Sequence, residues 1–267
     1  MNAIEERLAL CRKKNEKAFV TYMTAGLPSM EGCRDVILAQ ADAGIDVIEL
    51  GIPFSDPVAD GPVIQEASYK SIRLGTNLKK VFDMLYKVRE EDHCHVPVVF
   101  MMYYNTILYY GLEAFVERCM ETGVDGLIVP DVPFEEQEEI QKYLDKPKAP
   151  VLIQLVAPVS KDRVPKILKN ARGFVYCVSS MGVTGQDSGA FHKNISQYLK
   201  DVKAVSKVPV MMGFGIKQPK DVENYKEVID GCIVGSALIK FMEENNYDTD
   251  AVKKYIKAFK QGLNLKE

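Results

Sequence analysis

Glu49 is the first residue whose position could do chemistry. It lies near the end of the apolar run DVIELGI, which begins at position 46 and is typical of a strand buried in a parallel sheet. A carboxyl group that points from such a strand into the interior loses its hydration, so its pKa rises from the reference of about 4.3. A raised pKa suits a general acid or base near neutral pH. Side chains alternate between the two faces of a strand, so Glu49 points to the same face as Val47. This face is either the interior or the outer surface of the sheet.

The loop after this run carries two further carboxylates. It reads PFSDPVADGP, and Asp56 and Asp60 stand between prolines that restrict φ. The loop should therefore be stiff for its length and should hold both side chains in few positions. Carboxylates held close to a third acquire different pKa values, which is useful in acid and base catalysis. A role in the turn, as a cap beside proline, is the alternative, and it suits Asp56 better than Asp60.

Glycines late in the chain form a second candidate site. MGFGIKQP contains Gly213 and Gly215 after one apolar run, and IVGSALIK passes through Gly235 and Ser236 from the next run into a helix. Glycine lets a backbone approach a ligand closely, and N–H groups at a helix N-terminus attract anions. Glycine also simply turns a chain, but two such pairs at consecutive strand ends predict a phosphate site.

Aromatic and apolar side chains near the ends of the apolar runs predict a pocket between the carboxylates and the glycines. They are Tyr22, Met101, Tyr103, Tyr176 and Phe214. For any one of them, packing in the core is the default interpretation, but together they favour a substrate with an aromatic body and a phosphorylated tail. The polar stretch SSMGVTGQDSGAFHK, which begins at position 179, is typical of a mobile lid or of an ordinary disordered loop.

The elements that must hold these residues repeat along the chain. A β-branched run, a turn and an amphipathic helical stretch recur, and there are eight such runs. The runs are AFVTYMTAG from 18, DVIELGI from 46, VPVVFMMYYN from 96, VDGLIVPDV from 124, APVLIQLVA from 149, GFVYCVSS from 173, VPVMMGFGI from 208 and GCIVGSA from 231. Helical patterns between them include MEGCRDVILAQADAG, GLEAFVERCMETG, FEEQEEIQKYLDK and KDRVPKILKNA.

Eight units without a linker predict one catalytic domain over residues 1–267, an α/β fold of the (β/α)8 or TIM-barrel type. The charged start MNAIEERLALCRKKNEK predicts an additional helix before the first strand. An open doubly wound sheet is the alternative, but MTAGLPS after the first run lacks the GxGxxG turn of that fold. Active sites of barrels lie at the C-terminal ends of the strands, where Glu49 and both glycine pairs fall.

Composition argues against several classes of function. Lys and Arg number 34 against 37 Asp and Glu, and no charged run resembles a segment that binds nucleic acid or a membrane surface. No apolar stretch reaches the roughly 18 residues that span a bilayer, and the N-terminus is charged where a signal peptide would be apolar. We therefore expect a cytoplasmic protein without nucleic-acid or membrane partners.

Cysteine and histidine usage argues against disulfides and metals. The six cysteines are scattered without a CxxC pair, which suits a reducing compartment, and we expect no disulfides. His93 and His95, in the sequence HCH, are the group that most resembles a metal site, but no further ligand follows at a familiar spacing. We expect a solvated loop there and no metal.

Taken together, the motifs resemble the tryptophan synthase α subunit family. The likeness begins at ELGIPFSDPVADGP and continues in order through MMYYN, DGLIVPDVP, GVTG, GFGI and IVGSA, so it covers essentially the whole chain. The resemblance implies a lyase that cleaves indole-3-glycerol phosphate to indole and glyceraldehyde 3-phosphate in tryptophan biosynthesis. It also implies that indole passes to a β subunit containing pyridoxal phosphate (PLP) in an α2β2 complex, while this chain needs no cofactor.

The resemblance also assigns roles to single residues. Glu49 would be the acid and base, and Asp60 would hold the indole N–H. Tyr176 and Thr184 would border the active site, with Thr184 on the lid. The loop that contacts the β subunit would include Pro53 and Asp56. Backbone N–H groups, and one hydroxyl, would bind the phosphate at Gly185, Gly215, Gly235 and Ser236.

Such a cleavage needs two carboxyl groups in different states. A protonated Glu49 can deliver a proton to C3 of indole and then accept one from the side-chain hydroxyl, while an ionised Asp60 stabilises positive charge on the ring nitrogen. The apolar strand end favours a protonated Glu49, and the polar loop favours an ionised Asp60. The lid sequence QDSGAF lacks the basic residue that the resemblance leads us to expect, so the sequence does not predict which contacts the closed lid makes.

Three other functions fit part of the pattern. A sugar-phosphate isomerase on the same barrel explains the glycines but not two carboxylates beside an aromatic pocket. A non-catalytic module that only activates a β chain would tolerate the loss of the acid, which the presence of Glu49 and Asp60 argues against. A stand-alone lyase that releases free indole is the closest alternative, and an assay with and without a β subunit distinguishes it.

Overall fold

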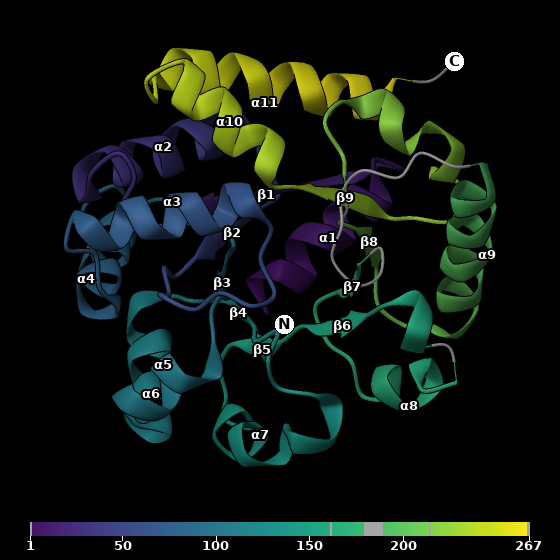
Figure 1. The fold of residues 1–267 in the computed structure, drawn as a ribbon, viewed down its shortest axis with the longest axis horizontal. Helices are drawn as coiled ribbons and strands as arrows, with labels where there is room; N and C mark the ends of the chain where they lie inside the picture. The colour runs from purple at the N-terminus through teal and green to yellow at the C-terminus, as the bar shows by residue number, and fades with distance from the viewer. Residues whose placement is uncertain (1, 161, 179–188, 214, 266–267) are drawn as a thin grey trace.

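Helices surround a central parallel sheet in the computed structural model of this chain (Figure 1). The structure describes residues 2–160, 162–178, 189–213 and 215–265, and the side chains of 189–194 are not among the described ones. Thr184, Gly185 and Phe214, which the sequence predicts to be site residues, lie outside the described residues. The predicted α/β barrel with its additional N-terminal helix is confirmed.

Nine strands form the sheet within these residues, and each paired neighbour runs parallel. Their order is β5-β4-β3-β2-β1-β9-β8-β7-β6. The strands are β1 Ala18–Thr24, β2 Val47–Gly51, β3 Val98–Met101, β4 Gly126–Ile128, β5 Val151–Leu152, β6 Gln154–Val156, β7 Val175–Cys177, β8 Val210–Met212 and β9 Gly231–Val234.

The fifth predicted run contains two strands, which is how the ring closes. Only Ile153 separates β5 from β6. β5 pairs with β4, β6 pairs with β7, and the Ile153 N–H donates to the Leu127 carbonyl at 2.8 Å. One continuous segment therefore changes its partner at Ile153, and each of the other seven predicted runs contains one strand.

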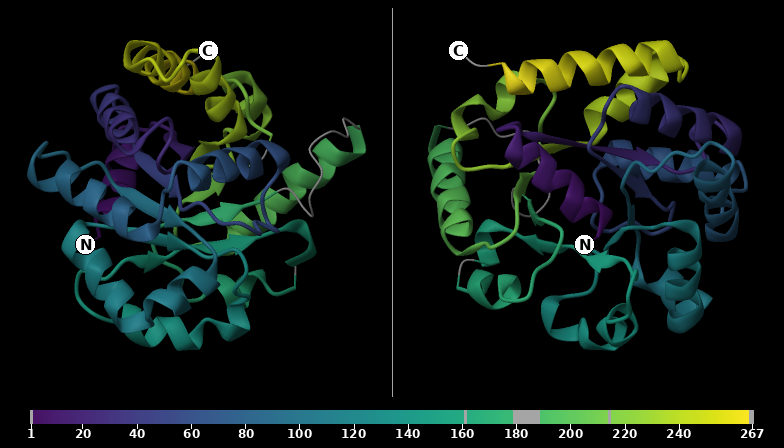
Figure 2. Two further views of the ribbon diagram at one scale, coloured as in Figure 1. Left: turned by 60° about the vertical axis from the view of Figure 1, so that its left-hand side comes forward. Right: turned by 180° about the vertical axis from the view of Figure 1, so that it is seen from behind.

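Helices cover the outside of the ring (Figures 1 and 2). The α-helices are α1 Ala3–Lys13, α2 Met30–Asp42, α3 Pro62–Arg73, α4 Leu78–Glu90, α5 Tyr104–Tyr110, α6 Leu112–Thr122, α7 Glu138–Leu144, α8 Val164–Leu168, α9 Gly189–Val205, α10 Ser236–Glu244 and α11 Thr249–Asn264. The 3₁₀ helices are η1 Phe134–Glu136, η2 Pro158–Ser160 and η3 Pro219–Tyr225.

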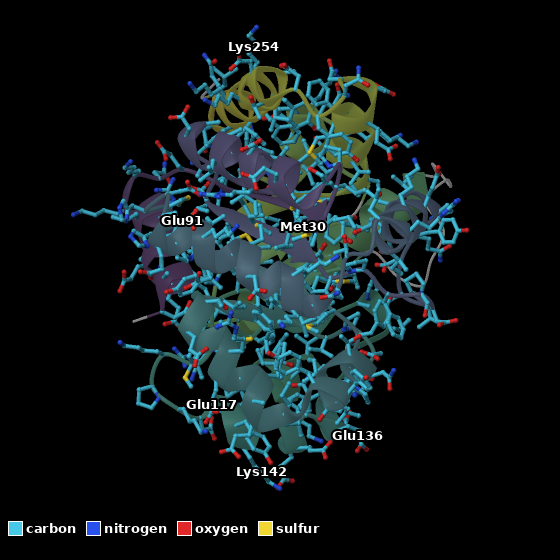
Figure 3. The ribbon with its side chains drawn as sticks, turned by 90° about the vertical axis from the view of Figure 1, so that its left-hand side faces the viewer. Met30, Glu91, Glu117, Glu136, Lys142 and Lys254 are labelled. Atoms are coloured by element: carbon cyan, nitrogen blue, oxygen red, sulfur yellow. The ribbon has the colours of Figure 1, made fainter. Side chains whose placement is uncertain are left out.

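Two predicted helices are shorter in the structure than in the sequence pattern. FEEQEEIQKYLDK divides into η1 and α7, and KDRVPKILKNA forms only the five-residue α8. Charged side chains of the outer helices, including Glu117, Lys142 and Lys254, project away from the barrel (Figure 3). No helix in the described part of the chain is both long and apolar enough to span a membrane.

The first strand shows why the runs lack polar alternation. Every residue of β1 is buried, because one face meets the helices and the other faces the barrel interior. On the outer face, Phe19 stacks on Phe259 of α11 with ring centroids 4.5 Å apart, and the Thr21 hydroxyl donates to Gln40 of α2 at 2.6 Å. Tyr22 alternates with these residues and therefore points inward.

The additional helix α1 covers the N-terminal end of the barrel, as the rear view in Figure 2 shows. Ile4 is fully buried, and a Cβ added at Gly126 of β4 would lie 2.9 Å from its Cδ1. The Asn2 side chain caps α1 and donates to the Asp125 carbonyl just before β4 at 2.8 Å. The helix thus closes the end of the barrel that lies away from the predicted site.

Asp46 joins the elements at this closed end. It is fully buried just before β2 and accepts hydrogen bonds from Arg7 of α1 at 2.8 Å and Lys260 of α11 at 2.7 Å. The Phe19 N–H and the Cys11 thiol donate to the same carboxylate, at 2.8 Å and 3.3 Å. Because β2 begins at the next residue, this network fixes the start of the strand that carries Glu49.

We predict that Asp46→Asn lowers the free energy of unfolding by about 3 kcal/mol, because it leaves two cations and a buried amide without their charged partner. Urea unfolding at pH 7 measures the change. Asp42→Asn is the control, since Asp42 pairs with Lys253 at the surface, and its loss should lower the stability much less than Asp46→Asn does. Equal effects of the two substitutions would contradict the structural role of Asp46.

Candidate active site

Glu49 lies in the barrel interior. It stands opposite Tyr22 of β1 and Val99 of β3 in the sheet register. Its charge also acts on Tyr176, whose strand β7 is not a neighbour of β2, so the two side chains face each other across the interior. The sequence leaves open whether the side chain of Glu49 points into the sheet interior or to its outer surface. In the structure it points into the barrel interior.

The Glu49 carboxyl is buried without compensation. Glu49 is only 3% exposed, and its Oε2 has no hydrogen-bond partner among the described residues. Burial raises the pKa of Glu49 to about 8, and the negative charge of Asp60 contributes to the rise. At pH 7 the carboxyl is therefore mainly protonated and can donate or accept a proton within the physiological range.

Asp60 approaches Glu49 from the loop after β2. Its Oδ2 accepts a hydrogen bond from the Tyr103 hydroxyl at 3.1 Å, and its carbonyl accepts one from the Gln65 side chain at 2.8 Å. Burial raises the pKa of Asp60 to about 6, while the Tyr103 hydrogen bond opposes the rise. The loop is less polar around Asp60 than the sequence indicates, yet the pKa of Asp60 stays below that of Glu49. At pH 7 the pair therefore contains one protonated and one ionised carboxyl group.

Asp56 does not join this pair. It is exposed, its carboxylate accepts a hydrogen bond from the Ser55 hydroxyl at 2.6 Å, and its carbonyl accepts one from the Val58 N–H at 2.9 Å. This is the turn role that the sequence offered as the alternative for Asp56. The expectation that both aspartates lie close to Glu49 is therefore wrong for Asp56. Pro53, on the same loop, is half-buried.

Two tyrosines flank Glu49, and each rests against a glycine of a neighbouring segment. A Cβ added at Gly51 would lie 2.1 Å from the Tyr22 hydroxyl, and one at Gly213 would lie 2.1 Å from the Tyr176 ring. Burial raises the pKa values of both tyrosines, and the carboxyl groups of the site add to the effect. The tyrosines are therefore neutral walls of the site.

The role of Gly51 is not among the predictions from the sequence, and Gly213 is predicted there only as part of a phosphate site. The signal was available at Gly51, where a glycine ends a strand of otherwise bulky residues. Met101 is the last residue of β3 and is buried, and Tyr103 follows it at the start of α5. The structure thus brings the predicted pocket residues Tyr22, Met101, Tyr103 and Tyr176 to the C-terminal half of the barrel.

The glycines predicted to bind phosphate lie after two adjacent strands. Gly215 follows β8 with φ +65°, and no atom of the described residues lies within 4 Å of a Cβ added there. Gly235 follows β9 and is the N-cap of α10, and no described side chain caps this helix. The first turn, from Ser236, therefore keeps N–H groups available for an anion. A Cβ at Gly235 would lie 3.4 Å from the Tyr22 Cβ, which puts this corner beside the aromatic wall.

Metal binding finds no support in the described parts of the chain. There, no three His, Cys, Asp or Glu side chains are grouped so that they could hold a metal ion. His93 and His95 lie in the loop between α4 and β3, and all six cysteines are free thiols.

Comparisons with known proteins point to one family. A sequence profile described as "Tryptophan synthase alpha chain" matches residues 8–266. The tryptophan synthase alpha chain of Lachnospira eligens is 56% identical over 265 residues, which cover 99% of this chain and 100% of that protein. The crystal structure of tryptophan synthase subunit alpha from Legionella pneumophila is 33% identical, covers 98% of each chain and has a TM-score of 0.87. A structure of Mycobacterium tuberculosis tryptophan synthase is 30% identical, again covers 98% of each chain and has a TM-score of 0.88.

The pKa of Glu49 predicts a pH dependence of stability. Between the ordinary value of 4.5 and about 8, the folded chain holds a proton on Glu49 that the unfolded chain has lost, so rising pH weakens the fold. Glu49→Gln removes this proton, and its free energy of unfolding relative to wild type should rise by about 3 kcal/mol from pH 5.5 to 8.5.

Urea unfolding across this pH range measures the difference. Glu117→Gln, on the exposed side of α6, is measured alongside as the control for a glutamate-to-glutamine change at the surface. A constant difference between Glu49→Gln and wild type would show that Glu49 titrates at the same pH in the folded and unfolded chains.

Proposed function

The chain belongs to the tryptophan synthase alpha chain family, and we propose that it cleaves indole-3-glycerol phosphate to indole and glyceraldehyde 3-phosphate by a retro-aldol reaction. The family consists of lyases of tryptophan biosynthesis. The observation that carries the proposal is the pair of carboxyl groups formed by Glu49 in the barrel interior and Asp60 on the loop after β2, with pKa values of about 8 and about 6.

The reaction begins with proton transfer to carbon. Protonated Glu49 delivers its proton to C3 of indole, which moves positive charge onto the ring nitrogen. Ionised Asp60 accepts a hydrogen bond from the indole N–H and stabilises that charge. The two carboxyl groups must be in different protonation states for this step, and the difference between their pKa values provides them near pH 7.

Bond cleavage returns the proton to Glu49. The Glu49 carboxylate takes the proton of the hydroxyl on the side-chain carbon bonded to C3, and the oxygen electrons form the aldehyde carbonyl. The electrons of the broken carbon–carbon bond restore the aromatic ring and neutralise the nitrogen. Glyceraldehyde 3-phosphate and indole are released, and no water is consumed.

The remaining site residues would bind the substrate. Tyr22, Met101, Tyr103 and Tyr176 would enclose the indole, with Phe214 and Thr184 added from outside the described residues. The phosphate would bind at Gly215, Gly235 and Ser236, where uncapped N–H groups support the assignment, and at Gly185. This chemistry requires no metal and no cofactor in this chain.

The partner in this proposal is a PLP-dependent β subunit that receives the indole in the cytoplasm, in an α2β2 complex. The loop between β2 and α3 supports the proposal, because its tip residue Val58 is 84% exposed and the exposed Asp56 lies beside it. Pro53 and Asp56 would contact the β subunit, and docking would hold Asp60 in its active position.

An indole-release assay with purified chain and indole-3-glycerol phosphate tests the proposal. General acid or base groups contribute 10² to 10⁴-fold, and Glu49 performs both transfers, so Glu49→Gln should lower kcat by about 10³ to 10⁴-fold. Glu117→Gln is the matched control and should retain wild-type activity. A Glu49→Gln variant that keeps more than about a tenth of wild-type kcat would contradict the assignment.

The same assay with a cognate β chain tests the partnership. Docking of the β chain should hold Asp60 in its active position and raise kcat at least about tenfold. Pro53→Ala or Asp56→Ala should reduce this activation. A fast isolated chain that the β chain does not activate would favour a stand-alone lyase. A chain that turns over a ribulose or aminosugar phosphate but not the indole substrate would favour the isomerase alternative.

A further inference from the structure

Tyr103 makes three contacts with the loop that carries Asp60. Its hydroxyl oxygen accepts a hydrogen bond from the Ala59 N–H at 2.9 Å and donates one to Asp60 Oδ2 at 3.1 Å. Its ring stacks on Phe54, with centroids 5.0 Å apart and planes 21° apart. One side chain therefore holds both ends of the segment from Phe54 to Asp60.

The backbone around Tyr103 is itself fixed. Tyr103 is 3% exposed and is the N-cap of α5. The Met102 N–H before it donates to the Ile128 carbonyl at the end of β4 at 3.0 Å. The Tyr104 N–H after it donates to both carboxylate oxygens of Asp131, at 3.0 Å and 3.1 Å. The hydroxyl of Tyr103 is thus presented to the loop from a rigid part of the barrel.

The Asp60 carboxylate depends on this hydroxyl. Among the described residues, Tyr103 is the one group that donates a hydrogen bond to it. Burial and the charge of Asp60 raise the pKa of Tyr103, so the proton stays on the tyrosine and the direction of the bond is fixed. The loop's other internal bond at this point, from the Asp60 N–H to the Pro57 carbonyl at 3.0 Å, fixes the backbone but not the carboxylate.

We propose that Tyr103 is a positioning residue that aims the Asp60 carboxylate at the substrate and keeps it ionised, acting through its hydroxyl and not merely as a wall of the pocket. This inference rests on the proposed function for its catalytic consequence, because the role of Asp60 in that reaction requires a charged and oriented carboxylate.

Removal of the hydroxyl should change the titration of Asp60 in a known direction. Among the described residues, the titratable groups whose charge couples to Asp60 are Glu49 from β2, Tyr22 from β1, Tyr176 from β7 and Tyr103 itself. Glu49 opposes a charge on Asp60, and the tyrosines are neutral, so the Tyr103 hydroxyl is the group in this set that stabilises the ionised form. Its loss raises the pKa of Asp60 from about 6 toward that of Glu49.

Tyr103→Phe is the test, because it keeps the ring and its stacking on Phe54. The acidic limb of kcat/KM against pH should move upward by about one pH unit, since a hydrogen bond to a charged group contributes an effect of that size. The Asp60 carboxyl carbon, followed by 13C NMR and assigned with Asp60→Asn, should show the same upward shift without substrate.

Tyr104→Phe is the matched control. The Tyr104 hydroxyl also donates to a carboxylate, that of Glu139 at 2.8 Å, but on the outside of the barrel. This variant should leave the activity and the Asp60 titration as in wild type. In the wild-type chain, the Ala59 amide should be protected from hydrogen exchange by its bond to Tyr103, which tests the contact without any substitution.

Specific results would overturn the inference. They are an unchanged Asp60 titration in folded Tyr103→Phe, an equal shift in Tyr104→Phe, or rapid exchange of the Ala59 amide. A wild-type chain that releases no indole, but whose Asp60 titration shifts in Tyr103→Phe, would refute the proposed function and retain the positioning role.

Discussion

One energetically unfavourable feature constrains the rest of the structure. A carboxyl group is buried inside the barrel, and no cation lies beside it among the described residues. Glu49 is buried between Tyr22 and Tyr176, and its pKa rises to about 8 because water is removed and Asp60 lies near. Keeping Glu49 protonated at pH 7 costs about 3 kcal/mol of folding free energy. A domain with a net stability of roughly 5 to 15 kcal/mol can sustain that cost only if the rest of the barrel is well fixed.

The contacts that stabilise the barrel lie mainly at the N-terminal end of the strands, opposite the active site. The Asp46 network joins α1, β1, β2 and α11 just before the strand that carries Glu49, and α1 closes the barrel end beneath it. At the active end, Gly51 and Gly213 leave space for the two tyrosine rings, and Tyr103 holds the loop of Asp60. Stability and chemistry are thus separated along the strands, as is usual in barrels of this kind.

The sequence predicts the features that depend on local pattern. The runs of buried residues predict the strands, and the carboxylate at the end of DVIELGI predicts the position of Glu49. Contacts between distant segments are not readable in this way. The partner change at Ile153 depends on where β4 and β7 lie, and the Asp60 carboxylate accepts its hydrogen bond from Tyr103, 43 residues away along the chain. The surroundings of Asp60 are more buried than its polar loop sequence indicates, because the barrel mouth and not the loop determines its hydration.

The central claim is that burial shifts Glu49 into the range where it exchanges protons near neutral pH. A 13C NMR titration of the Glu49 side-chain carboxyl, in a chain with labelled glutamate and with Glu49→Gln for assignment, tests this directly. The structure predicts a titration midpoint near pH 8, well above the ordinary value of 4.5. A midpoint close to 4.5 in the folded chain would contradict the claim, since Glu49 would then be ionised at pH 7 and would have no proton to deliver to the substrate.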